Sequence, residues 1–172
     1  MNRALSEASL DNRWLIYALN PAGVKLNPDQ ETSLFDRQRQ EKRRLAHQLW
    51  ALCHLRRVSG DESVSDGLMA GLCQRMAEGN GLDIPVHDLY CERVAFPLIG
   101  GHAELINRRW VVRMIENQRQ DGGRRDPWYG FSSTLEWGDN PQSNEHTTLL
   151  ALWALRQVKY GHPEAFTLPD NR

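Results

Sequence analysis

The sequence has few cysteines, no excess of either charge and no long apolar run, and each of these shortages excludes a class of protein. Three cysteines, Cys53, Cys73 and Cys91, are spread over 172 residues. An odd number of unclustered cysteines is typical of free, mostly buried thiols in a reducing compartment. We therefore expect a cytoplasmic protein.

The charges nearly balance, with 21 basic and 22 acidic residues and a formal net charge of −1. A domain that binds nucleic acid through its phosphates carries a clear basic patch. The one basic run, residues 37–44, also contains Glu41, which is typical of a solvated helix face. We therefore expect no nucleic acid partner.

No segment approaches the roughly 18 consecutive apolar residues of a membrane-spanning helix, so we expect no membrane span. The N-terminal sequence has Glu7 where a secretory signal would need an apolar run. There is also no phosphate-binding loop of the Walker type, no dinucleotide fingerprint and no Gly-x-Ser-x-Gly elbow. The commonest nucleotide-binding and hydrolase motifs are thereby excluded.

The apolar residues recur at helical spacing and predict an all-α fold with almost no strand. The expected helices span residues 4–19, 29–58, 64–78, 86–99, 103–118 and 144–160. The last of them is apolar on nearly every side, which is typical of a helix buried by its neighbours. Pro97 is expected to kink or shorten the fourth helix.

The turns between these helices predict how they are arranged. The short Gly100-Gly101 turn indicates that the helices on either side of it are antiparallel. Repeated units of helix, glycine-containing turn and helix are typical of stacked antiparallel helical hairpins. We expect a single helical domain over residues 1–166, followed by a tail over 167–172.

A connector of about twenty residues joins the last two expected helices, and a connector of that length is more often functional than filler. Trp128, Tyr129 and Phe131 lie in it and are candidate ligand-binding residues, because aromatic rings beside polar groups suit small molecules and peptides. The alternative is that the connector folds back and fills the helical stack with its own rings.

Carboxylates and a histidine flank the same connector. Asp121, Glu145 and His146 are candidate catalytic residues, since a carboxylate paired with an imidazole can transfer protons near neutral pH. The alternative for Glu145 is purely structural, because a carboxylate early in a helix is stabilised by the positive end of the helix dipole.

Two segments resemble a known superfamily. These are Ile115-Glu116-Asn117-Gln118, followed by Asp121-Gly122-Gly123, and the run His146-Thr147-Thr148-Leu149-Leu150-Ala151-Leu152-Trp153-Ala154-Leu155. Over about residues 86–160 the chain is similar to the α/α toroids, which include terpenoid cyclases and the β-subunits of protein prenyltransferases. The resemblance implies a partial α/α-toroid-like stack of helical hairpins. Six helices make half of such a ring, so we expect either an open stack or a homodimer that completes it.

The resemblance also implies a zinc site. Prenyltransferases hold zinc with an aspartate and a cysteine at the start of one inner helix and a histidine at the start of a later one. The matching residues are Asp88, Cys91 and His146, although two residues separate Asp88 from Cys91 where the family has one. Three protein ligands would leave the fourth zinc position open. The alternative is that Cys91 is a small buried side chain and Asp88 a helix-start carboxylate.

Together these features predict a ligand-binding pocket at the helix starts, under the connector 121–145. Its ligand would be a small molecule, a peptide or a lipid-like tail. Two alternatives remain open at this stage. One is a protein-interaction module, because open helical stacks commonly bind partners along one face. The other is a zinc-dependent enzyme of the prenyltransferase type.

Overall fold

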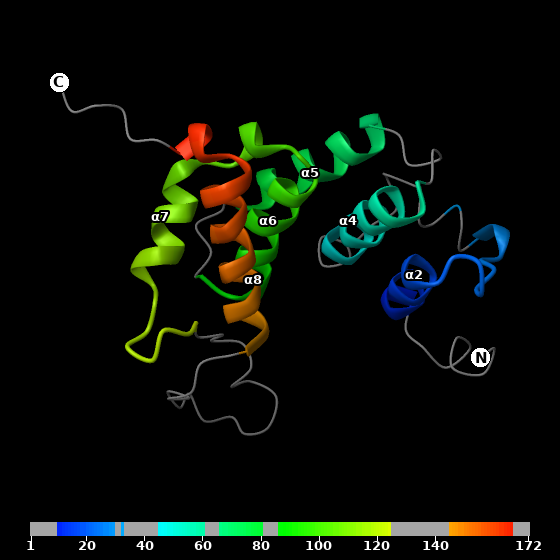
Figure 1. The fold of residues 1–172 in the computed structure, drawn as a ribbon, viewed down its shortest axis with the longest axis horizontal. Coiled ribbons are helices and arrows are strands. Elements are labelled where there is room, and N and C mark those ends of the chain that lie inside the picture. The colour runs from blue at the N-terminus through cyan, green and yellow to red at the C-terminus, as the bar shows by residue number, and fades with distance from the viewer. Residues whose placement is uncertain are drawn as a thin grey trace. The chain divides into compact units, whose positions relative to one another are not determined.

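The computed structural model describes residues 10–29, 32, 45–60, 66–80, 86–124 and 145–166 (Figure 1). Within these ranges every regular element is a helix and there is no strand, so the prediction of an all-α fold is confirmed. None of the described helices is both long and apolar enough to cross a membrane. The chain divides into two compact units, Met1–Met76 and Ala77–Arg172.

The first unit is built on two helices, α2 (Leu10–Leu19) and α4 (Leu45–His54), which pack against each other. A π-helical turn, η1 (Leu55–Ser59), continues α4 and ends at Gly60, whose φ of 63° favours glycine. The buried leucines of α4 and η1 recur at helical spacing, as the sequence predicts: Leu45, Leu49, Leu52 and Leu55. The next helix, α5 (Asp66–Asn80), runs across the division into the second unit.

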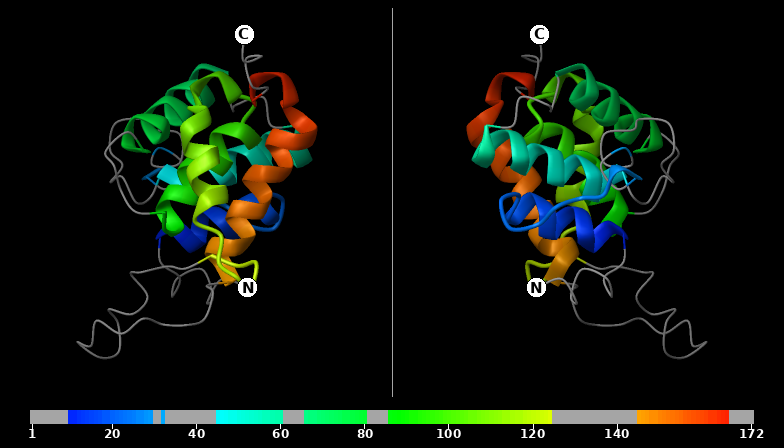
Figure 2. Two further views of the ribbon diagram at one scale, coloured as in Figure 1. Left: turned by 90° about the vertical axis from the view of Figure 1, so that its left-hand side faces the viewer. Right: turned by 90° about the vertical axis from the view of Figure 1, so that its right-hand side faces the viewer.

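The second unit is centred on α6 (Asp88–Ile99), which packs most extensively on α8 (Glu145–Arg156) and also contacts α7 (Arg108–Glu116). Three short elements complete it, namely the 3₁₀ turn η2 (Ala103–Leu105), the π-helical turn η4 (Gln157–Gly161) and the 3₁₀ turn η5 (Pro163–Phe166). In Figure 2, α7 and α8 lie side by side on one face of this unit.

Helix α6 is the core of the second unit, because every residue from Tyr90 to Leu98 is buried. His87 caps its start, with its Nδ1 accepting a hydrogen bond of 3.1 Å from the Leu89 N–H. The helix does not end at Pro97 but runs two residues further to Ile99. A proline in the last turn removes one backbone hydrogen bond only, so the helix tolerates it there.

The fifth expected helix starts later and ends sooner than predicted. Residues 103–105 form the separate turn η2, and α7 begins only at Arg108. Asn107 explains the break, because its side chain accepts a hydrogen bond of 2.9 Å from the Arg109 N–H and caps α7.

The prediction that the last helix is buried on all sides is wrong. Leu149 is 59% exposed and Leu152 is 56% exposed. The buried face of α8 consists of Thr147, Leu150, Ala151 and Ala154. Only one side of α8 faces the core of its own unit, so the leucines on the other side remain in contact with water.

Candidate metal centre

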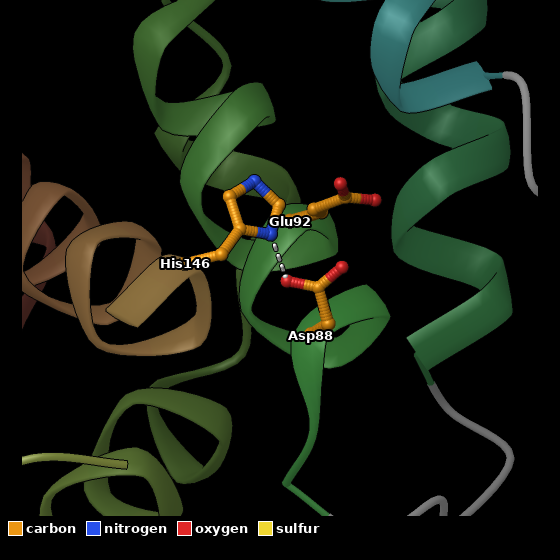
Figure 3. Close-up of side chains that lie close together, drawn as sticks. All are labelled: Asp88, Glu92 and His146. Carbon is orange, nitrogen blue, oxygen red and sulfur yellow. Dashed lines mark ion pairs between the residues drawn. The ribbon is translucent and has the colours of Figure 1, made fainter. Parts of the chain in front are cut away.

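Two helices of the second unit bring three potential metal ligands together. Asp88 and Glu92 lie one turn apart on α6, and residues four apart share one side of a helix. His146 is the second residue of α8, the helix packed against α6. Each residue offers one ligand atom, and these three atoms lie within 4.8 Å of one another (Figure 3). The closest approach joins His146 Nδ1 to Asp88 Oδ1, at 2.6 Å.

The cluster formed by Asp88, Glu92 and His146, hereafter the donor cluster, has a buried side and an open side. Glu92 is 5% exposed. The side chains of Asp88 and His146 are 29% and 53% exposed. A metal ion bound to all three would therefore contact protein on one side and face water on the other.

Glu92 lies in a setting that disfavours its negative charge. Its pKa is raised from 4.5 to about 8, because burial and the nearby charge of Asp88 raise it by more than Arg93 lowers it. Within the described part of the chain, no hydrogen bond reaches the Glu92 carboxylate. A buried carboxylate is normally paired, hydrogen-bonded or coordinated to a metal. Glu92 thus has the character of a ligand that a cation would stabilise.

Arg93, the next residue, is held by a different contact. Its Nη1 donates a buried hydrogen bond of 2.9 Å to the carbonyl oxygen of Gly79. A Cβ at position 79 would lie 2.9 Å from the Arg93 guanidinium carbon, so a larger residue there would displace the guanidinium group. Arg93 therefore contributes charge near Glu92 while its hydrogen bond fixes it to the end of α5.

The structure places Cys91, the third ligand suggested by the resemblance, away from the other two. Its side chain is fully buried, and it interacts with the buried Arg124, whose pKa is lowered by burial and raised by Cys91. At about 100° per residue, Cys91 lies about 60° to one side of Asp88 around α6, and Glu92 lies about 40° to the other. The structure therefore groups Glu92, and not Cys91, with Asp88 and His146.

The predicted acid–base residues are divided between two places. Asp121 and Glu145 line an open hollow of about 450 Å³ beside the start of α8. The Asp121 carboxylate accepts a hydrogen bond of 2.9 Å from the Gly123 N–H. His146 is not among the residues that line this hollow and belongs to the donor cluster. The predicted ligand-binding residues Trp128, Tyr129 and Phe131 lie outside the described residues.

Glu92 is the one member of the donor cluster that sequence reasoning missed. The available signal was a carboxylate four residues after Asp88, in the middle of a helix that is otherwise mostly apolar. A carboxylate at such a position is either buried among the apolar side chains or exposed by a gap in the apolar face. Attention to the Asp-x-x-x-Glu spacing would have identified it.

The chain matches no protein-family model, no curated protein and no solved structure. Its function therefore has to be inferred from the geometry of its own side chains.

Proposed function

We propose that this protein binds a divalent metal ion, zinc before others, through Asp88, Glu92 and His146. The observation that supports the proposal is the convergence of three ligand atoms within 4.8 Å, contributed by two packed helices. Carboxylate oxygen and imidazole nitrogen are both normal zinc ligands. The same set also suits manganese, while the imidazole disfavours magnesium and calcium, which prefer oxygen.

The metal ion would serve to bind a ligand at the starts of α6 and α8. Three protein ligands leave at least one coordination position open, as in sites where zinc binds water or a substrate. The half-exposed side chain of His146 and the partly exposed side chain of Asp88 put that position on the water-facing side. The positive ends of two helix dipoles lie close by and favour an anionic group. A small molecule that carries a carboxylate or phosphate is therefore the expected ligand.

The alternative of a prenyltransferase-type enzyme has less support. It rests on Cys91 as a zinc ligand, and the burial of Cys91 beside Arg124 gives that cysteine a different environment.

Metal titration tests the proposal. We expect metal-stripped protein, purified without a histidine tag, to bind one zinc ion per chain in isothermal titration calorimetry. Asp88→Asn, Glu92→Gln and His146→Ala should each weaken zinc binding by at least about tenfold, because each removes one of three ligands. His146→Ala should leave the melting temperature almost unchanged, since its side chain is half exposed.

The chain provides two matched controls. His102 and Glu104 form a second histidine–carboxylate pair, with Nδ1 and Oε1 3.0 Å apart, and this pair is not part of the donor cluster. His102→Ala should therefore bind zinc like the wild type. Cys91→Ser should do the same. If zinc fails to bind, or binds equally well to all three cluster variants, the proposal is wrong.

A further inference from the structure

Helices α7 and α8 expose apolar side chains on neighbouring surfaces. Val112 and Ile115 on α7 are 37% and 51% exposed, and Leu149 and Leu152 on α8 are 59% and 56% exposed. Each pair is spaced three residues apart and so shares one side of its helix. The two helices pack against each other and lie side by side in Figure 2. These four residues form the centre of what we call the α7–α8 face.

The two helices run in opposite directions. After the end of α7, residues Asp121 to Gly123 line the same hollow as the first turns of α8, and the Arg124 N–H donates to Thr148 Oγ1 at 2.8 Å. At the opposite end, the start of α7 lies near the turn η4, which continues α8 (Figure 1). The start of α7 is therefore near the end of α8.

This arrangement gives the α7–α8 face a basic end and an acidic end. The charged side chains there are all exposed or half exposed. The basic end carries Arg108, Arg109, Arg156 and Lys159, and the acidic end carries Glu116, Asp121 and Glu145. Three nearby charges have the opposite sign, namely Glu104 at the basic end and Arg113 and Arg119 at the acidic end, and all three already have partners within the same copy.

Helix stability does not explain the charges of Arg108, Arg109 and Glu116 on α7. Arg108 and Arg109 occupy its first turn, next to the positive end of the helix dipole, and Glu116 occupies its last position, next to the negative end. Both placements are unfavourable for an isolated helix. A contact with another molecule would pair these charges with charges of the opposite sign.

We propose that a second copy of this chain covers the α7–α8 face, related to the first by a two-fold axis that passes through its apolar centre and lies in the plane of the contact, perpendicular to the two helices. Such an axis places the basic end of each copy over the acidic end of the other, so both ends are complementary at once. It also packs the four exposed apolar side chains against their own counterparts. The hollow beside Leu149 and Leu152 gives the partner's side chains room to insert.

A second copy fits better than a partner of uniform charge. An acidic partner would be repelled at Glu116, Asp121 and Glu145, and a basic partner would be repelled at the other end. In a contact between two copies, each basic end meets an acidic end, so neither end is repelled. This inference does not depend on the metal ion, because the apolar centre and the charged ends of the α7–α8 face include none of the three donor residues.

Sedimentation equilibrium on the full chain tests the inference. We expect a dimer that dissociates on dilution, and we expect Leu152→Asp to weaken it by at least about tenfold, because a charge would enter the apolar centre. Leu19→Asp is the matched control, since Leu19 is an equally exposed leucine, at 61%, in the first unit. It should leave the dimer unchanged.

Charge reversal tests the two-fold arrangement itself. Arg109→Glu sets a new carboxylate opposite Glu116 of the other copy, and Glu116→Arg sets a new guanidinium opposite Arg109 of the other copy. Each variant alone should therefore self-associate at least about tenfold more weakly than the wild type. A mixture of the two variants should form a mixed dimer with near wild-type affinity. Circular dichroism should show that both variants remain helical.

Three outcomes would overturn the inference. If the wild-type chain stays monomeric up to several hundred micromolar, a second copy does not cover the α7–α8 face. A dimer that Leu152→Asp does not weaken uses another surface. Charge-reversed variants that fail to associate when mixed exclude the proposed two-fold axis.

Discussion

Helices α6 and α8 pack against each other, yet they distribute polar and apolar residues in opposite ways. Helix α6 buries Glu92 and Arg93 along with its apolar residues. Helix α8, which has the longer run of apolar residues, exposes Leu149 and Leu152. Position in the unit therefore decides burial here more than composition does, since α6 is enclosed and α8 has one open side.

The difference points to what each helix lacks by itself. A buried carboxylate without a hydrogen bond from the described residues is stabilised by a cation. A pair of exposed leucines is stabilised by an apolar surface. The proposed metal ion beside α6 would supply the cation. The proposed second copy beside α8 would supply the apolar surface.

The contrast is tested most sharply by replacing one leucine in each helix with alanine. We expect the larger loss of unfolding free energy in α6. Leu98 is 1% exposed, so Leu98→Ala leaves a cavity in the core and should lower the free energy of unfolding by about 2–5 kcal/mol. Urea denaturation of dilute protein measures it. A loss below about 1 kcal/mol would mean that α6 is not enclosed as described.

The second test concerns the buried carboxylate of α6 in metal-free protein. The pKa of Glu92 in the folded state is raised from 4.5 to about 8. Between these values the unfolded chain has lost this proton and the folded chain retains it, so the stability contributed below pH 4.5 is lost as the pH rises towards 8. The free energy of unfolding should fall by at most ~1.4 kcal/mol per pH unit.

Glu92→Gln should abolish this part of the pH dependence and should be more stable than the wild type at pH 8. Glu104→Gln is the control, because Glu104 is exposed and its pKa is lowered rather than raised. Equal slopes for wild type and Glu92→Gln between pH 5 and pH 8 would show that Glu92 is not buried without a partner.

A smaller loss of unfolding free energy is expected from removing the cap at the start of α7. The exposed Asn107 caps α7 through a single hydrogen bond to the Arg109 N–H. Asn107→Ala should cost about 1 kcal/mol of unfolding free energy. Asn107→Asp retains the acceptor and should restore most of it. If both variants unfold like the wild type, the cap does not set the start of α7.

The smallest effect should come from the exposed side of α8. Leu152→Ala should change the free energy of unfolding of the dilute monomer by less than about 0.5 kcal/mol, since its side chain is already 56% exposed. Urea denaturation at low protein concentration checks this. A loss comparable to that of Leu98→Ala would remove the distinction between the two helices.

The sequence predicts the all-α class and most helices because apolar spacing and glycine or proline turns are local signals. It does not predict the break at Asn107, since a capping side chain competes with a helical pattern that looks continuous. Nor does it predict the exposed Leu149 and Leu152, because exposure depends on which neighbours α8 has. The prediction of one domain over residues 1–166 stays a prediction, and a single cooperative transition in the urea curves would support it.

The candidate site was predicted only in part, for a similar reason. Asp88 and His146 were identified from a resemblance, and the structure brings their side chains into contact. Glu92 was missed because the resemblance pointed to Cys91. A difference of one residue along α6 moves a side chain by about 100° around the helix, and only the packing of α8 shows which side matters.

X-ray absorption spectroscopy of the zinc-loaded protein tests the central claim most directly. The account predicts a first shell of nitrogen and oxygen alone, at about 2.0–2.2 Å, because Asp88, Glu92 and His146 supply no sulfur. The spectrum of Cys91→Ser should be identical. A sulfur ligand at about 2.3 Å that disappears in Cys91→Ser would contradict the account and return the site to the ligand set of the prenyltransferases.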